Sequence, residues 1–274
     1  MLNRRTFLTA ACACCGGLAA APLAVRAAGA APSDEGLPQA LELGDTPMTR
    51  LAKTVWVRRL ASGLWLHATT NLIAAGFYYP ANGLILERRG GSLMIDTGYA
   101  PEQAEVLLDW SRRNLQSPIS LAVATHFHND RTGGIPDLQK HGVRTLAYPL
   151  TCDLARAAGQ PVPEPIEGWT TGAHRLGADC ELYFPGAGHT RDNVVAWMPR
   201  QRVLFGGCLI KSITSKGMGN TADAVMGDYA ATVRGVQARY PRAKAVVPGH
   251  GTISGDPIGH TLALLAQAGE GHPP

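Results

Sequence analysis

The sequence has 274 residues, of which 45% are hydrophobic and 17% charged, a balance typical of one or two packed globular domains. The formal net charge is +4, but Arg4, Arg5 and Arg26 all precede the first acidic residue, Asp34, and without these three arginines the charge is +1. A nearly neutral chain without a basic run excludes nucleic acid as the expected partner.

Residues 1–30 have the features of a secretory signal, because Arg4-Arg5 precede an apolar, alanine-rich stretch that ends in small residues. The run Asn3–Leu8 resembles a twin-arginine signal, with a general secretory signal as the alternative. A lipoprotein signal built on Cys12 is disfavoured, since the apolar stretch before it is short. We therefore expect export to the periplasm, and no later stretch has the length and hydropathy of a transmembrane helix.

The mature chain is expected to begin with a loose segment, residues 31–49, followed by one folded domain, residues 50–270. Strand-like runs separated by turn residues open this domain, at 54–57, 64–68, 83–87 and 92–95. The stretch Asn71–Pro80 lies between two of these strands and has apolar residues in its middle. It is either a hairpin packed into the core or a mobile hairpin that covers a ligand.

Helical and strand patterns then alternate to the end of the domain. Helices are predicted at 102–115, 136–141, 152–158, 228–240 and through Ile258, Leu262 and Leu265, and strands at 119–124, 181–184, 194–198, 202–205 and 244–247. The proline-rich residues 160–168 are expected to form an exposed connection. Because each half has strands followed by helix and strand, the simplest packing is two sheets face to face with helices outside, an α/β fold.

A cluster of ligand-type residues follows the apolar strand 119–124. His126, His128 and Asp130 are spaced at i, i+2 and i+4, and imidazole and carboxylate groups are ligands that Zn²⁺ takes. Three more candidates each lie in a glycine-rich turn: His189, Cys208 and His250. Each residue alone is a weak signal, but six such residues at the ends of predicted strands indicate a metal site. The other histidines, His67, His141, His174, His260 and His272, lack this context and receive no role.

The donor types divide into two sets. His126, His128 and His189 would form a three-imidazole zinc site with one open position, and Asp130, Cys208 and His250 a second site with mixed ligands. Two ions about 3.5–4 Å apart can share a hydroxide, and zinc lowers the pKa of bound water to about 7, so no serine or cysteine nucleophile is required. Cys208 as a ligand would be a thiolate. The other two cysteines of the mature chain, Cys152 and Cys180, are expected to be buried and free.

These residues resemble a known family. The pattern of the six ligand-type residues is similar to that of class B metallo-β-lactamases of the subclass with a cysteine ligand, and the resemblance spans residues 54–268. The supporting motifs are Asn82-Gly83-Leu84, Ile95-Asp96-Thr97-Gly98, Gly206-Gly207-Cys208-Leu209-Ile210-Lys211-Ser212, Gly219-Asn220 and Pro248-Gly249-His250-Gly251. Related thioesterases carry a histidine directly after the aspartate, where this chain has Arg131, and usually an aspartate where it has Cys208.

The resemblance implies a four-layer αβ/βα sandwich, two zinc ions and a periplasmic, monomeric enzyme. Its implied activity is zinc-dependent hydrolysis of the β-lactam amide bond of penicillins, cephalosporins and carbapenems, which gives antibiotic resistance. The alternatives are a related periplasmic metallohydrolase acting on lactones or thioesters, and a zinc-binding protein without catalytic activity.

The resemblance also implies roles for individual residues. Lys211 would bind the carboxylate of the substrate, and Asn220 would bind and help to polarise the lactam carbonyl. Asp130 is implied as a catalytic residue as well as a ligand. Asp96 and Arg131 would orient the ligands without touching the metal. Residues 71–79 would form a flexible hairpin over the site.

Overall fold

The computed structural model describes residues 47–73 and 77–270, which belong to one compact unit. The expected signal segment, almost all of the expected loose segment and the tip of the predicted hairpin, residues 74–76, lie outside the described residues. The first strand begins at Thr49, the last residue of that loose segment.

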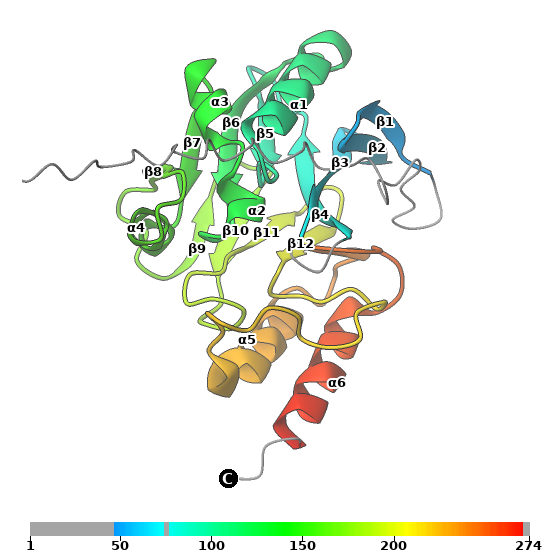
Figure 1. The fold of residues 1–274 in the computed structure, drawn as a ribbon, viewed down its shortest axis with the longest axis vertical. Helices are drawn as coiled ribbons and strands as arrows, with labels where there is room; N and C mark the ends of the chain where they lie inside the picture. Colours follow the sequence, from blue (N-terminus) through cyan, green and yellow to red (C-terminus); the bar gives the residue numbers. More distant parts are fainter. Residues whose placement is uncertain (1–46, 74–76, 271–274) are drawn as a thin grey trace, which may run out of the picture. The chain divides into compact units, whose positions relative to one another are not determined.

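Two sheets form the centre of this unit (Figure 1). The first contains eight strands in sequence order: β1 (Thr49–Ala52), β2 (Val55–Ala61), β3 (Leu64–Leu72), β4 (Tyr78–Leu86), β5 (Ser92–Ile95), β6 (Ile119–Ala124), β7 (Arg144–Ala147) and β8 (Glu164–Pro165). The second has the order β13-β12-β11-β10-β9: β13 (Ala245–Pro248), β12 (Val203–Gly207), β11 (Val195–Met198), β10 (Glu181–Phe184) and β9 (Gly172–Arg175).

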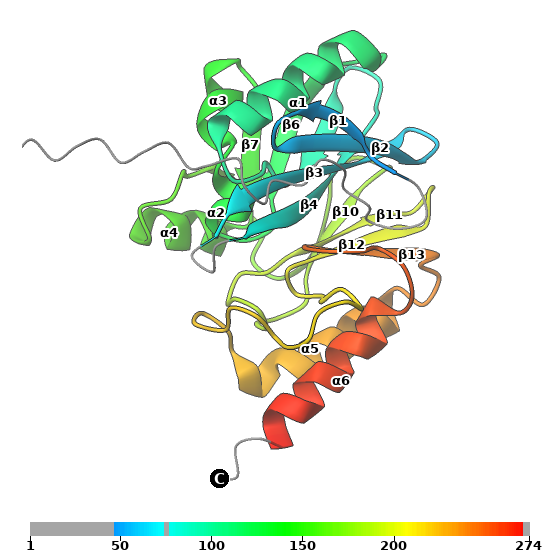
Figure 2. The ribbon, with the colours of Figure 1, turned by 45° about the vertical axis from the view of Figure 1, so that its right-hand side comes forward.

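Helices cover the outer faces of both sheets (Figure 2). The helices are α1 (Pro101–Asn114), α2 (Asn129–Thr132), α3 (Ile135–Lys140), α4 (Pro149–Ala157), α5 (Met226–Arg239) and α6 (Pro257–Glu270). Helices α1 and α3 lie on the outer side of the first sheet, and α5 and α6 on the outer side of the second. The layers are therefore helix, sheet, sheet, helix, which confirms the predicted four-layer α/β sandwich.

Side-chain alternation along the strands explains this layering. In β4, Leu84 and Leu86 belong to the apolar core between the two sheets, whereas Ile85 points the other way and packs beneath α1 with Leu107. Successive side chains of a strand face opposite sides of the sheet, so a strand that is apolar at every position can be covered on both faces. The second sheet is covered in the same way, and Val233 of α5 belongs to its outer cluster.

The strands of the predicted hairpin are longer than the apolar pattern indicates. Strands β3 and β4 pair continuously, from Leu64 opposite Leu86 to Leu72 opposite Tyr78. Backbone pairing continues after the apolar run ends, through the polar residues Thr69 and Thr70. Both of these residues are buried. The hairpin therefore projects from the sheet as a paired ribbon.

The connection at 160–168 differs from its prediction as a wholly exposed loop. Pro163 and Ile166 are buried, and Ile166 packs into the core between the sheets. Glu164–Pro165 form β8, a short strand parallel to β7 at the edge of the first sheet. An edge strand tolerates proline because the missing N–H can face away from the ladder. The sequence pattern also did not indicate α2, β7 or β9.

The three cysteines of the described residues, Cys152, Cys180 and Cys208, are buried and free, as expected for the first two. Among residues 47–73 and 77–270, none of the helices combines the length and hydropathy needed to cross a bilayer.

Candidate metal centre

Three of the six ligand-type residues are delivered by the end of β6. This strand lies between the parallel strands β5 and β7, and His126 follows it after Thr125. The chain then turns into α2, with His128 as the residue before the helix and Asp130 in its first turn. The carboxyl ends of neighbouring parallel strands meet at one edge of a sheet, so this edge can present polar side chains together.

The other three residues come from the second sheet. Cys208 directly follows β12, and His250 follows β13 after Gly249. The two strand ends are joined, because the Gly249 N–H donates to the Gly207 carbonyl at 2.7 Å. A Cβ at Gly249 would lie 2.7 Å from the Cys208 sulfur, so only glycine allows this close approach. His189 lies in the loop between β10 and β11.

The six side chains form one contiguous cluster. The Asp130, Cys208 and His250 donor atoms all lie within 4.8 Å of one another, as do those of His126, His128 and Asp130 and those of His126, His189 and Cys208. The three rings of the imidazole set also meet edge to face, with centroids 4.8 Å (His126–His128), 5.0 Å (His126–His189) and 5.2 Å (His128–His189) apart. The structure thus brings both predicted sets together.

The spacing and chemistry of these donors fit zinc. His126 Nε2 lies 3.2 Å from His128 Nδ1, and Cys208 Sγ lies 3.1 Å from His250 Nε2 and 3.5 Å from Asp130 Oδ2. Two nitrogen donors on a tetrahedral zinc ion, each about 2.0–2.1 Å from the metal, lie about 3.3 Å apart. Nitrogen, thiol and carboxylate donors at such separations suit this borderline cation.

Arg131 lies directly behind the Asp130, Cys208 and His250 set and is fully buried. Its Nη2 lies 2.7 Å from Asp130 Oδ2, 2.9 Å from Cys208 Sγ and 3.2 Å from His250 Nε2. Its Nη1 donates to Asp96 Oδ2 at 3.0 Å. Asp96, also buried, accepts two further hydrogen bonds from Thr125, at 2.8 and 2.9 Å. Arg131 therefore links donors from both sheets to the buried Asp96.

The electrostatics of His126, His189 and Asp130 favour the protonation states that a metal requires, whereas the thiolate form of Cys208 is disfavoured while no cation is bound. Burial lowers the pKa of His126 and of His189 well below the usual value, so both imidazoles are neutral at pH 7. Burial alone would raise the pKa of Asp130, but the Arg131 guanidinium and His250 outweigh it and lower that pKa well below its usual range. Asp130 is therefore a carboxylate. Burial raises the pKa of the Cys208 thiol, and Arg131 opposes this effect.

A pocket of about 560 Å³ opens over the cluster. Its walls include Lys211, Asn220 and the described end of the hairpin, where Phe77 is 50% exposed. Tyr79 from the same hairpin stacks on the His250 ring, with centroids 4.6 Å apart and planes 26° from parallel. The hairpin thus reaches the donor cluster itself, which favours the covering role over simple core packing.

Two contacts with the donor residues were not found from the sequence. His128 Nε2 lies 2.9 Å from Asp223 Oδ2, which comes from the loop between β12 and α5. Nothing in the local pattern around Asp223 indicates this contact. The position of Tyr79 against His250 was also missed, although its place two residues from the apolar middle of the hairpin was a partial signal.

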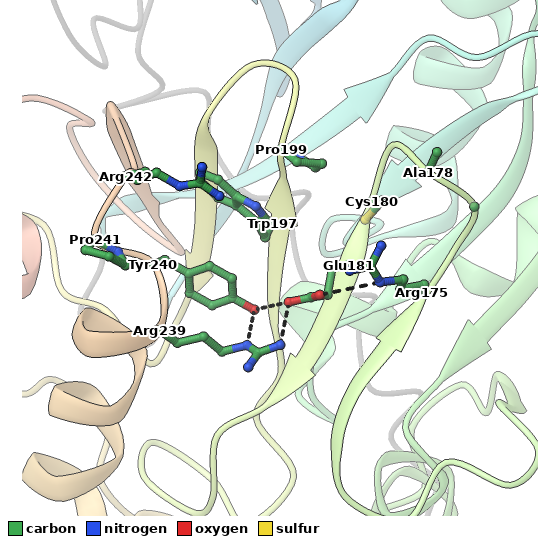
Figure 3. Close-up of a pocket in the computed structure, with 11 residues that line it drawn as sticks. Arg175, Ala178, Cys180, Glu181, Trp197, Pro199, Arg239, Tyr240, Pro241 and Arg242 are labelled. Carbon is green, nitrogen blue, oxygen red and sulfur yellow. Dashed lines mark hydrogen bonds and ion pairs between the residues drawn. The ribbon is translucent and has the colours of Figure 1, made fainter.

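A second pocket, of about 320 Å³, contains none of these donors (Figure 3). Its central carboxylate, Glu181, already contacts Arg239 Nη2 and the Tyr240 hydroxyl, each at 2.9 Å, and lies 3.9 Å from Arg175 Nε. None of the donor groups found within the described residues includes a residue that lines this pocket. The pocket over the six donors is therefore the candidate active site.

Two facing sheets with helices outside and a six-donor centre at their shared edge define the class of metal-dependent hydrolases to which the sequence motifs pointed. Residues 78–250 match the family model described as the metallo-beta-lactamase superfamily. This chain belongs to that superfamily.

Curated relatives and solved structures agree with this assignment. The chain is 33% identical to a metallo-beta-lactamase type 2 from Bacillus cereus, covering 77% of this chain and 83% of the relative. It is 32% identical to the enzyme of that name from Bacteroides fragilis, covering 80% and 88%. A metallo-beta-lactamase from Pontibacter korlensis has a similar structure, with a TM-score of 0.72, 39% identity and coverage of 77% and 99%. FIM-1 from Pseudomonas aeruginosa, solved in a mono-zinc form, has a TM-score of 0.74 at 32% identity, covering 78% and 96%.

Proposed function

We propose that this protein hydrolyses the amide bond of β-lactam antibiotics in a zinc-dependent reaction. The observation that carries the proposal is the pocket lined by four of the six zinc-type donors, His128, Asp130, His189 and His250, together with Lys211 and Asn220. The other two donors, His126 and Cys208, belong to the same donor groups. The names of its relatives support the same chemistry, since they are metallo-beta-lactamases at 32–33% identity over most of their length. The proposed substrates are penicillins, cephalosporins and carbapenems.

Two zinc ions per chain are proposed. His126, His128 and His189 would hold one, and Asp130, Cys208 and His250 the other, with the ionised Asp130 supplying negative charge for the second cation. When bound, zinc polarises a substrate carbonyl and lowers the pKa of water to about 7, so that a nucleophile exists at neutral pH. No protein nucleophile is needed for such chemistry.

The protein's own side chains bind and orient the substrate. Lys211 lines the pocket beside the donor cluster, where its ammonium group can bind the carboxylate of a β-lactam. Asn220 Oδ1 accepts a hydrogen bond from the Ala222 N–H at 3.1 Å, which leaves its Nδ2 group free to donate to the lactam carbonyl. Ile73 and Phe77 add apolar side chains to the wall of this pocket.

We also propose that the protein is exported to the periplasm by a twin-arginine signal in residues 1–30 and acts there as a monomer. The arginine pair Arg4-Arg5 and the alanine-rich stretch after it support this location. A periplasmic site is also where β-lactams would meet the enzyme.

A substrate panel tests the activity. Initial rates are measured on one penicillin, one cephalosporin and one carbapenem, with a lactone and a thioester in parallel, before chelation, after chelation and after return of zinc. We expect β-lactam turnover that disappears with chelator and returns with zinc. His126→Ala should lose it, and His174→Ala, a histidine outside the donor groups, should keep it. Turnover of only the lactone or thioester, or tight zinc binding without any turnover, would overturn the proposal.

A further inference from the structure

A separate cluster of ligand-type side chains lies at the contact between α1 and α3. Glu105 comes from α1, Asp137 from α3, and His141 directly follows α3. Their donor atoms all lie within 4.8 Å of one another, and none of the three residues lines the candidate active site. The sequence patterns assigned none of them a role.

The Asp137 carboxylate is the unusual member of this cluster. Its side chain is only 8% exposed, and its Oδ2 atom is buried and accepts no hydrogen bond among the described residues. This oxygen faces His141 Nδ1 at 3.2 Å, whereas the other oxygen, Oδ1, lies 4.0 Å from the exposed Lys140 ammonium. A buried carboxylate oxygen without a donor is costly, so such an oxygen is expected to have a proton donor or a cation as its partner.

The spacing of these donors suits a metal ion. Asp137 and His141 are four residues apart, so they lie on the same face of one helical turn. The 3.2 Å between Asp137 Oδ2 and His141 Nδ1 is close to the about 3.3 Å that separates two donors on a tetrahedral zinc ion. Glu105 is exposed on the neighbouring helix, and its flexible side chain can supply a third oxygen.

We propose that Glu105, Asp137 and His141 form a binding site for a divalent transition-metal ion of the zinc type, separate from the catalytic cluster. Water would complete the coordination. Nδ1 of His141 also lies 3.0 Å from the Asp137 carbonyl oxygen, and with a proton on Nδ1 it donates a hydrogen bond there. A metal ion bound at Nδ1 requires the neutral tautomer with its proton on Nε2. A neutral ring reaches that tautomer when Nδ1 gives its proton to solvent and Nε2 takes one up, and a doubly protonated ring reaches it by release of the Nδ1 proton alone.

An ion at this site would join two helices that already share an apolar contact. Leu138 of α3 packs with Ala104 and Leu107 of α1 in one buried cluster. Helix α3 follows α2, which carries Asp130, so a bridge to α1 would brace the segment that presents the catalytic donors. The ion is expected to add to stability, since binding to the folded state alone stabilises a protein by mass action. It is not expected to take part in hydrolysis.

Metal counting with matched variants tests this site. The full-length protein is equilibrated with free zinc from nanomolar to micromolar concentrations, and bound zinc per chain is measured by native mass spectrometry. We expect Glu105→Gln and His141→Ala each to bind one ion fewer than the wild type, and the control His174→Ala to bind the same number. Glu105 is exposed, so its replacement leaves the core intact.

The thermal transition supplies a second readout. Saturating zinc should raise the Tm of the wild type more than that of Glu105→Gln, while β-lactam turnover at saturating zinc is equal in the two proteins. Equal zinc counts in all four proteins throughout the titration would overturn the site. A lower count in His141→Ala but not in Glu105→Gln would overturn the three-donor assignment. Because the readout is a difference in metal count, the test of this site does not depend on whether the protein hydrolyses β-lactams.

Discussion

His128 Nε2 lies 2.9 Å from a carboxylate oxygen of Asp223, and Nδ1 of the same ring faces His126 Nε2 at 3.2 Å. One nitrogen of the ring therefore points into the donor cluster while the other points to an acid on a distant loop. A carboxylate that accepts the outer N–H of a ligating histidine fixes the tautomer and raises the basicity of the ligand. Asp223 thus orients His128 from outside the cluster.

Asp223→Ala is expected to weaken zinc binding by about 10–100-fold, the loss typical when the partner of a ligating histidine is removed. Competition with a chromophoric chelator measures the affinity. Asp223→Asn is the matched control, because its Oδ1 atom can still accept the N–H of His128, and it should lose less. Equal affinity in the alanine variant and the wild type would show that Asp223 does not support the ligand.

Cys208→Ser is expected to weaken metal binding at the Asp130, Cys208 and His250 set and to spare the three-histidine set. The sulfur is buried and lies 3.1 Å from His250 Nε2. Serine replaces this soft sulfur donor with a harder and smaller hydroxyl, so only this set loses a ligand. Native mass spectrometry is done in the Glu105→Gln background, so that the proposed site between α1 and α3 does not contribute to the count. The double variant Glu105→Gln/Cys208→Ser should bind one ion fewer than Glu105→Gln alone. Cys152→Ser, which replaces a buried thiol outside the donor groups, is the control and should leave the count unchanged. Two equally tight ions in Cys208→Ser would contradict the assignment of Cys208 as a ligand.

The six donors could be predicted because each one carries a local signal. His126 follows an apolar strand, and Cys208 and His250 lie in glycine turns whose close approach leaves no room for a Cβ. The packing of two sheets with helices outside could also be inferred, since each half of the chain has strands followed by helix and strand. Asp223 and the stacking of Tyr79 on His250 could not, because both depend on how a loop or hairpin folds back over residues more than 90 positions away.

The same reason applies to the short elements that the pattern did not indicate. Strands β7 and β9 have four residues each and acquire their strand geometry from partners in the sheet. Helix α2 has only four residues and lies inside the ligand motif. Ile166 is buried because β8 joins the sheet edge, a tertiary contact that overrides the exposed character of a proline-rich stretch.

Acid is expected to destabilise the protein partly through His67. This ring is 1% exposed, its Nε2 lies 3.3 Å from the Ile95 carbonyl oxygen, and its Nδ1 has no hydrogen-bond partner among the described residues. Burial lowers the pKa of His67 from 6.5 to about 4. Between these values the unfolded chain binds a proton that the folded chain does not. The free energy of unfolding therefore falls as pH decreases from 6.5 to 4, by about 3 kcal/mol from this residue.

Urea unfolding of the wild type and of His67→Gln at several pH values measures this contribution. The variant should be less stable at pH 7, because the packing around Gly83 and Ile95 changes, but its stability should fall less between pH 6.5 and pH 4. The comparison of slopes separates His67 from the other groups that titrate in this range. Parallel pH profiles of the two proteins would show that His67 is not the titrating group.

Lys211→Ala is expected to raise KM for β-lactams that carry a carboxylate, with a smaller change in kcat. A cation that binds this carboxylate does so about equally in the ground state and the transition state, and uniform binding of that kind is expressed mainly in KM. A charged hydrogen bond contributes roughly 1.5–3 kcal/mol, so the increase should be about ten- to a hundred-fold.

Lys211→Arg should recover part of the loss, because the charge remains although its geometry differs. Lys216→Ala, an exposed lysine outside the pocket, is the control and should leave KM unchanged. Steady-state kinetics on one penicillin and one carbapenem measure KM and kcat for each variant. Zinc is measured in the same samples, and its content should stay constant because Lys211 is not a proposed ligand. An unaltered KM for both substrates in Lys211→Ala would remove this lysine from substrate binding.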